Sequence, residues 1–356
     1  MAFKIGALKM GRGGAEAPAA KPAATSRGLL SGPLPVLGRM RVGVQLQILT
    51  TALVFFLVVD GAIVALDARQ GTIGTAYIAA VGKIRMLSQR LAKAAQQASQ
   101  GNREAFKQLR QSRDEFDTLM KVLATGGSAE GVQVPATAEG AKPALDKLEG
   151  EWRKTERNAS LVIGEEKNLV ALGEAVRRIN QNNPTLLELA DEIAALSVQA
   201  GGSARQNAVT GQLVMMTQRM AKNANAMLAS DVVDPEVAFL LGKDTNTFRD
   251  MLQGLLKGSD ALRIQEVRDP EIKGKLSELE VGFREYQGAV ADILGNQQRL
   301  VNAKRATRDI FNDSETLLAA SERLNEAYQG ELEARTYNFI ALGVVSALAF
   351  ITLLLV

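Results

Sequence analysis

GKIRMLSQRLAK at residues 82–93 and GQLVMMTQRMAK at residues 211–222 are two versions of one segment. Aligned with an offset of 129, they share six pairs of identical residues: Gly82/Gly211, Met86/Met215, Gln89/Gln218, Arg90/Arg219, Ala92/Ala221 and Lys93/Lys222. Further matches continue at offsets up to 132, as far as Leu187 and Leu318. A pattern that recurs over such a distance indicates two copies of one structural unit.

Each copy has the pattern of a helical unit. Apolar residues recur at steps of three and four from Leu169 to Ile193, which is typical of a helix with one face in a bundle. Strands have little support, because β-branched clusters with a period of two are lacking. Breaks are expected at residues 100–102, 125–143, 164, 230–235 and 257–271. The spacing therefore predicts four helices in each copy.

These helices predict an all-α fold with two tandem four-helix bundles, one at residues 67–200 and one at residues 201–337. Asp234-Pro235-Glu236 is a typical helix start, with a capping aspartate, a proline in the first turn and an acidic residue after it. A single long helix from Leu169 to Leu228 could join the two copies, with Pro184 as the expected weak point.

Two uncharged runs enclose the duplicated region. Residues 42–59 form one run, which continues past Asp60 to residue 66, and residues 339–356 form the other. Each run is close to the roughly 20 residues that cross a bilayer. We therefore expect transmembrane helices at residues 42–66 and 338–356, and we favour an anchor over a cleaved signal peptide for the first. The second run ends the sequence without a polar flank, which predicts that a longer protein continues beyond it.

The charge distribution predicts the topology. Residues 1–41 carry seven basic residues and one acidic residue, so this Gly-, Ala- and Pro-rich tail is expected to be disordered. By the positive-inside rule the tail is cytoplasmic, and two spans then place residues 67–337 on the far side of the membrane. Nucleic-acid binding is not expected, because no basic or aromatic recognition face accompanies the tail.

The composition excludes most catalytic chemistry. The chain has no Cys and no His, so it has no disulfide, no thiolate or imidazole metal site and no imidazole base. We therefore expect no enzyme activity, no metal and no cofactor.

The repeated segment resembles the signature of the PilJ-type sensor domains, which occur in type IV pilus chemoreceptors and in nitrate- or nitrite-responsive sensors. The resemblance rests on Gly82, Arg85, Met86, the run from Ser88 to Lys93, and the second copy of the segment. It implies a homodimeric four-helix-bundle sensor that spans the bacterial inner membrane as a multi-pass protein, with residues 67–337 in the periplasm, and that signals across this membrane. The implied partners are a chemotaxis adaptor and kinase, reached through a cytoplasmic part outside this sequence, and a pilin or a small anion in the periplasm.

The same resemblance places an anion ligand at Arg85, where two subunits meet. Arginine suits a small oxyanion, because its planar guanidinium presents several N–H donors and stays charged. Arg85 shares a helix face with Ser88 and Gln89, so these three residues form the candidate ligand site. The alternative is a surface or packing role for Arg85. Val214 replaces the arginine in the second copy, which puts anion binding there in doubt.

The other residues of the segment are expected to have structural roles. Arg90 and Arg219 are expected to form hydrogen bonds inside the bundles, and the methionines at 86, 215, 216 and 220 to fill the cores. The remaining motif residues are expected to support packing: Gly82, Lys93, Gly211, Gln218 and Lys222.

The favoured function is the sensory region of a chemoreceptor linked to type IV pili and twitching motility. Two alternatives stay open: a two-span envelope scaffold that binds another periplasmic protein, and the sensor region of a nitrate- or nitrite-type histidine kinase.

Overall fold

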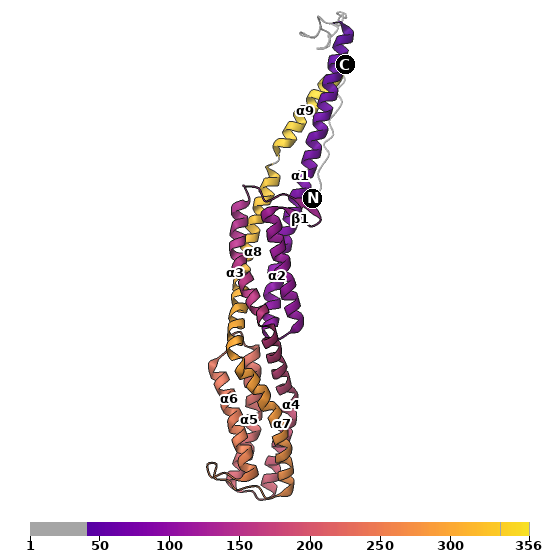
Figure 1. Ribbon diagram of the computed structural model, residues 1–356. Helices are drawn as coiled ribbons and strands as arrows, with labels where there is room; N and C mark the ends of the chain where they lie inside the picture. Colours follow the sequence, from indigo (N-terminus) through magenta and orange to yellow (C-terminus); the bar gives the residue numbers. More distant parts are fainter. Residues whose placement is uncertain (1–40, 335, 356) are drawn as a thin grey trace, which may run out of the picture. The chain divides into compact units, whose positions relative to one another are not determined.

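The computed structural model describes residues 41–334 and 336–355 (Figure 1). Over these residues the chain forms nine helices and one short hairpin, so the predicted all-α class is confirmed. The hairpin is the one departure from the expectation of no strands, and its three-residue strands turn the chain between two helices. The basic tail before Arg41 lies outside the described residues.

The elements follow the predicted breaks and add two that were not predicted, at residues 200–203 and at Asn296. Their bounds are α1 (Val42–Ser99), α2 (Arg103–Thr125), β1 (Gly127–Ala129), β2 (Val132–Val134), α3 (Lys142–Gly164), α4 (Glu166–Gln199), α5 (Ala204–Ala229), α6 (Pro235–Lys257), α7 (Pro270–Gly295), α8 (Gln297–Glu333) and α9 (Thr336–Leu355). The predicted helix start at Asp234 is confirmed, because its carboxylate accepts a hydrogen bond from the backbone N–H of Glu236 at 2.8 Å.

The chain divides into two compact units, and the smaller one is apolar. It contains α1 up to Ala62 and α9 from Leu342 onward. Large apolar side chains are exposed on it, including Val58 on α1 and Phe350 on α9. Among the described residues, α1 alone is long and apolar enough to cross a membrane, while the apolar stretch described within α9, Ile340–Leu353, is shorter. The length criterion thus supports one of the two expected spans.

A polar contact joins the two helices of the apolar unit. The Ser346 hydroxyl on α9 donates a hydrogen bond to the Asp60 carboxylate on α1 at 2.9 Å. Asp60 is the single charged residue between positions 42 and 66. The charge of Asp60 therefore faces another helix of the apolar unit.

The larger unit, residues 63–341, repeats its local structure in detail. Gly126 after α2 and Gly258 after α6 have φ values of 85° and 83°, and each donates its N–H to the carbonyl four residues earlier at 2.8 Å. Both lie in the left-handed region, which glycine adopts without the steric penalty of a side chain. The duplication seen in the sequence is therefore also present in the turns.

The cores of the two copies are also alike. Phe116 on α2 stacks on Trp152 on α3, with ring centroids 3.8 Å apart. The aligned residues of the second copy, Phe248 and Phe283, pack with centroids 4.4 Å apart. All four rings are buried, so the same aromatic contact joins the second and third helices of each copy.

The packed bundles do not coincide with the two sequence copies. The expectation was one bundle before and one after the boundary between residues 200 and 201, and the helices pack differently. Helix α3 packs mainly against α8, whereas α4 packs against α5 and α7. We call α2, α3, α8 and the part of α1 after residue 62 the first bundle, and α4–α7 the second bundle (Figure 1). The fourth helix of each copy thus completes the bundle of the other copy.

The connections explain this exchange. Glu165 alone separates α3 from α4, and Asn296 alone separates α7 from α8. A helical hairpin needs a loop of about two to five residues to reverse direction. Because one residue is too short for a reversal, α4 and α8 run on past the ends of α3 and α7 into the other bundle.

The single long helix that the sequence allows from Leu169 to Leu228 is not formed. Pro184 lies inside α4 without ending it. The break falls at residues 200–203, where Gly201 has a φ of 69° and Ser203 caps α5 through its hydroxyl. The chain reverses there, so α4 and α5 pack side by side.

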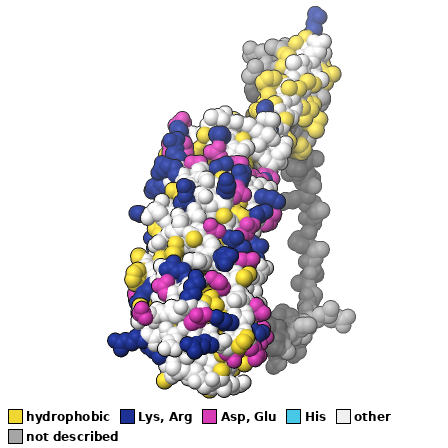
Figure 2. Space-filling view, turned by 60° about the horizontal axis from the view of Figure 1, so that its bottom comes forward, with side chains coloured by type: hydrophobic (Ala, Val, Ile, Leu, Met, Phe, Trp, Pro, Cys, Tyr) yellow, Lys and Arg dark blue, Asp and Glu magenta, His cyan; other side chains and the backbone are white. Residues whose placement is uncertain are grey.

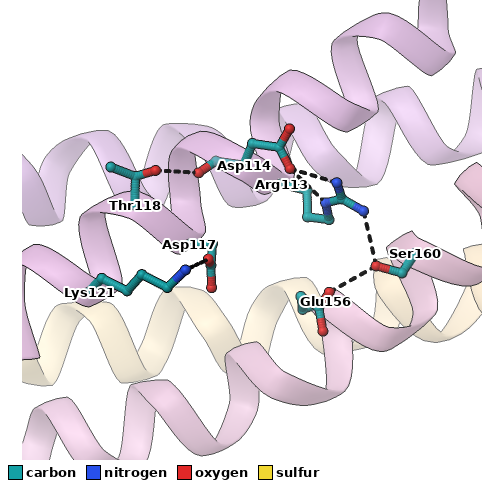
Figure 3. A network of polar contacts seen from close by, with 7 residues as sticks. All are labelled: Arg113, Asp114, Asp117, Thr118, Lys121, Glu156 and Ser160. Atoms are coloured by element: carbon teal, nitrogen blue, oxygen red, sulfur yellow. Dashed lines mark hydrogen bonds and ion pairs between the residues drawn. The ribbon is translucent and has the colours of Figure 1, made fainter.

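The outer surface of the bundles is polar. Figure 2 shows basic and acidic side chains mixed over the visible face of the bundles, while hydrophobic side chains cover much of the apolar unit. Between α2 and α3, Arg113 contacts Asp114 and Ser160, and Ser160 donates to Glu156 (Figure 3). Exposed pairs of this kind contribute only about 0–1 kcal/mol each, so these contacts mark a solvated surface.

Candidate functional site

The repeated segment places most of its shared residues on the outside of the bundles. On α1, four of them are exposed at steps of four, three and four, and we call these the α1 stripe: Gly82, Met86, Gln89 and Lys93. On α5 the aligned residues form the α5 stripe: Gly211, Met215, Gln218 and Lys222, of which Gly211 is half-buried and the others are exposed. The spacing matches the a and d positions of a heptad, which line one side of a helix.

Apart from the buried pair Ala92 and Ala221, the core positions of the same segment vary between the copies. Ile84 and Leu87 are buried on α1, where the second copy has Leu213 and Met216. Ser88 and Thr217 are buried at another aligned position. A core position requires only suitable volume, so it tolerates such exchanges. Identity on the exposed side therefore needs a reason other than packing within one chain.

The expectation that the motif methionines fill the cores is wrong for two of them. Met86 is 51% exposed and Met215 is 64% exposed. Met220 is fully buried, and Met216 packs at the edge of the core. The helical phase explains the difference, because Met86 and Met215 lie on the stripes and the other two face inward.

Arg85 lies at the edge of the α1 stripe and has a partner within the chain. Its guanidinium forms an ion pair with Glu322 on α8 at 3.0 Å, and both side chains are nearly half exposed. A ligand anion at Arg85 would therefore compete with a carboxylate that is already in place. Sequence reasoning missed Glu322, because it lies 237 positions from Arg85 and outside the repeated segment.

The candidate ligand residues are not brought together. Ser88 is 2% exposed, and its hydroxyl donates to the backbone carbonyl of Arg85 at 2.8 Å. Gln89 is exposed on the stripe. The expected shared face of Arg85, Ser88 and Gln89 is thus wrong for Ser88, because a residue three positions after Arg85 has already turned into the core.

The second arginine of the motif makes interhelical contacts in both copies. Arg90 donates to the side-chain oxygen of Gln111 on α2 at 3.2 Å. Arg219 forms a two-pronged ion pair with Asp244 on α6, with 2.6 Å between Nε and Oδ2. Asp244 is 1% exposed, and its carboxylate raises the pKa of Arg219. The Arg219 contact therefore joins a half-exposed guanidinium to a buried carboxylate, and the Arg90 contact is an exposed polar one.

A tyrosine clamp, formed by Tyr77 and Tyr328, joins α1 to α8. Their rings stack with centroids 4.6 Å apart. The Tyr77 hydroxyl donates to the carbonyl of Pro135 at 2.7 Å, and the Tyr328 hydroxyl lies 2.6 Å from Thr137 Oγ1. Burial raises the pKa of both phenols. The sequence gives no signal for this clamp, because the position aligned with Tyr328 in the first copy is Ser197.

The described residues do not offer a metal centre, since no three Asp or Glu side chains among them are placed to hold an ion. The arrangement is a set of helices joined by ion pairs, stacked rings and hydrogen bonds, with repeated exposed stripes on α1 and α5. Such an arrangement can bind and transmit movement along its helices.

Comparison with known proteins agrees with this geometry. The family model PilJ, which describes the N-terminal region of type IV pili methyl-accepting chemotaxis transducers, matches residues 69–177 and 195–308. The chain therefore belongs to this family of chemoreceptor sensory regions.

Two curated relatives extend beyond the chain. It is 28% identical to Protein PilJ of Pseudomonas aeruginosa over 280 residues, which are 79% of this chain and 41% of that protein. It is 25% identical to the putative methyl-accepting chemotaxis protein AlkN of Alcanivorax borkumensis over 300 residues, which are 84% of this chain and 43% of that protein. The chain thus spans less than half the length of the curated relatives it matches.

Proposed function

We propose that the chain is the sensory region of a transmembrane chemoreceptor linked to type IV pili and twitching motility. In this proposal α1 and α9 both cross the bacterial inner membrane, the N-terminal tail is cytoplasmic and the two bundles are periplasmic. The excess of basic residues before α1 supports the orientation. Binding in the periplasm is relayed inward to a cytoplasmic signalling part, which acts through a chemotaxis adaptor and kinase.

The observation that carries this proposal is the direct coupling of α1 to α8. The tyrosine clamp and the pair of Arg85 with Glu322 join these helices in the first bundle. Helix α9 follows α8 in the chain, and in the apolar unit it contacts α1 through Ser346 and Asp60. A displacement of α8 along or around α1 therefore has a continuous path toward α9. A ligand can shift that equilibrium when it binds one arrangement better than the other.

The α1 stripe supports a homodimer. Gly82 and Gln89 are seven residues apart, and so are Met86 and Lys93. The two pairs therefore occupy the two core positions of a heptad, and together they form a seam that fits an identical helix across a two-fold axis. A Cβ atom added at Gly82 would have no heavy atom within 4 Å, so the stripe leaves space for the backbone of a second helix. In such a dimer the two Arg85 residues lie at the edge of the seam, where a small anion could compete with Glu322, and a pilin is the alternative partner.

We expect oxidation in membranes to link two chains through a cysteine at Met86→Cys and, to a similar extent, at Met215→Cys. The chain has no native cysteine, so any disulfide-linked dimer reports the introduced residue. Lys107→Cys, on the exposed side of α2, is the control and should remain monomeric on non-reducing gels. Equal linking at all three positions would mean random collision and would remove the stripes from the interface.

A hybrid receptor tests the proposed function. Residues 1–356 are joined to the part of P. aeruginosa Protein PilJ that follows its matched region and are expressed in cells without their own PilJ. We expect twitching motility to be restored by this hybrid and not by a control that lacks residues 63–334. A hybrid that reaches the membrane but leaves motility unchanged would contradict the sensory role.

A further inference from the structure

A cavity of about 150 Å³ lies where the two bundles meet. Its walls come from the end of α1, the loop between α5 and α6, and α8. The Arg85 contact lies elsewhere on α1, about three helical turns from the cavity residue Gln96. A cavity of this volume holds a molecule of roughly the size of benzene.

Lys304 on α8 is the buried cation of this cavity. It is 5% exposed, and its ammonium donates to the backbone carbonyl of Leu228 at 2.7 Å and to that of Ser230. These carbonyls end α5, where a cation is favoured by the helix dipole. Burial lowers the pKa of Lys304 to about 8. An ammonium has three N–H donors, so one remains for an acceptor in the cavity.

Other donors line the cavity without partners. Among the described residues, the Arg308 guanidinium and the side-chain amides of Gln96 and Gln100 make no hydrogen bond or ion pair. Asp231 is the one acidic residue of the lining, against the two cations Lys304 and Arg308. The cavity therefore has a net positive charge and a surplus of donors, which suits an anionic acceptor. Phe311, 64% exposed, adds an apolar wall.

The buried lysine and its cavity occur in the second copy of the repeat and not at the aligned position of the first copy. With the offset of 131, Lys304 aligns with Gly173. A Cβ at Gly173 would lie 3.0 Å from the carbonyl oxygen of Gln100 and 3.2 Å from Gly101 Cα, so the turn after α1 closes directly onto α4. In the second copy a longer loop, residues 230–234, follows α5, and the lysine reaches beneath it. The second copy therefore has a lysine and a cavity where the first has a closed glycine contact.

We propose that this inter-bundle cavity binds a small organic monocarboxylate, with its carboxylate held by Lys304 and Arg308 and its short apolar body against Phe311. The amides of Gln96 and Gln100 provide further donors from α1. A bound carboxylate contacts α1, α8 and the loop after α5 at once, and so it stabilises one placement of α8 against α1. Binding itself does not depend on the proposed signalling role, because it is a property of the bundles alone.

Calorimetry on the full chain in nanodiscs tests this site with butanoate and benzoate as probes. Butanamide and benzamide have nearly the same shape without the charge, and they should bind at least about tenfold more weakly, since one decade of affinity corresponds to the loss of one charge-assisted contact. Nitrate tests the separate anion position proposed at Arg85: binding there should be lost in Arg85→Gln. We expect Arg85→Gln to leave butanoate binding unchanged.

Arg308→Gln should weaken butanoate binding by about tenfold or more, and Phe311→Ala should weaken benzoate binding. Both side chains are exposed and without polar partners, so the variants are expected to fold. Arg305→Gln, on the exposed side of α8 and outside the cavity, is the matched control and should bind as the wild type does. The proposal is overturned by the absence of heat with both carboxylates, by equal binding of the amides, or by an Arg308→Gln variant with unchanged affinity.

Discussion

Arg219→Ala is expected to lower the free energy of unfolding of the second bundle by about 1–3 kcal/mol, because it leaves the buried Asp244 carboxylate without its half-exposed partner. The substitution removes both prongs of the contact with Asp244 and leaves a carboxylate that is 1% exposed without a counter-charge. An uncompensated buried charge is far more costly than the net contribution of an exposed ion pair. Circular dichroism of the detergent-solubilised chain measures the loss as a lower midpoint of denaturant unfolding. Hydrogen exchange locates it in α5 and α6.

The duplication provides a matched control for this prediction. Arg90→Ala changes the same motif position in the first copy, where the contact is a 3.2 Å hydrogen bond to the neutral, exposed Gln111. Its effect should stay near 1 kcal/mol or below. In addition, Arg219→Ala combined with Asp244→Asn should recover much of the lost stability, because the second substitution removes the orphaned charge. Equal losses at Arg90 and Arg219, with no recovery in the double variant, would argue that the buried Asp244 carboxylate does not depend on Arg219.

The sequence was sufficient to predict most of the helices and their duplication, but not the breaks at residues 200–203 and at Asn296. The breaks near residues 101, 126, 165, 232 and 260 are local features, since glycine, proline and capping residues determine where a helix ends. The aligned aromatic residues also identified equivalent core positions, as in Phe116 and Phe248. These signals depend on a few neighbouring residues and are therefore readable from one chain.

The partner of each fourth helix could not be predicted in this way. A repeat shows which helices are equivalent but not which copy each one packs with. Here the outcome depends on the length of two connections, and the single residues Glu165 and Asn296 direct α4 and α8 into the opposite bundles. The expected contacts of Arg85 failed for a related reason: Glu322 comes from α8, whose position beside α1 follows from this exchange.

The orientation of side chains around α1 was only partly predictable. The apolar periodicity predicted roughly which side of the helix faces the core. A helix turns by about 100° per residue, however, so an error of one position moves a side chain from core to surface. Ser88 and Met86 were both affected, since the first is buried and the second is exposed. The inter-bundle cavity was also invisible in the sequence, because Lys304 lies in a charged stretch of α8 that resembles a solvated helix face.

Removing the hydroxyl from each of two buried tyrosines, Tyr328 and Tyr286, should change the free energy of unfolding in opposite directions. Tyr328→Phe removes the contact with Thr137 and should lower the free energy of unfolding by about 1 kcal/mol. The hydroxyl of Tyr286 is buried without a partner among the described residues, so Tyr286→Phe should be neutral or stabilising by up to about 1 kcal/mol.

Burial raises the pKa of both phenols, Tyr286 and Tyr328. The two phenols therefore stay protonated in the native state above about pH 10, where they ionise in the unfolded chain. The free energy of unfolding should accordingly fall as the pH rises above about 10.

Tyr328→Ala should have a much larger effect and lower the free energy of unfolding of the first bundle by about 3–5 kcal/mol. The side chain is 1% exposed, and its loss empties the space between α1 and α8 and removes the stacking on Tyr77. Trp152, the single tryptophan of the chain, is buried in the first bundle, so its fluorescence reports this loss separately from the second bundle. Phe311→Ala, at an exposed position of the same helix, is the control and should shift the transition by less than about 0.5 kcal/mol. If Tyr328→Ala also leaves the Trp152 transition in place, the clamp does not hold α8 against α1, and the relay between these helices has to run through other contacts.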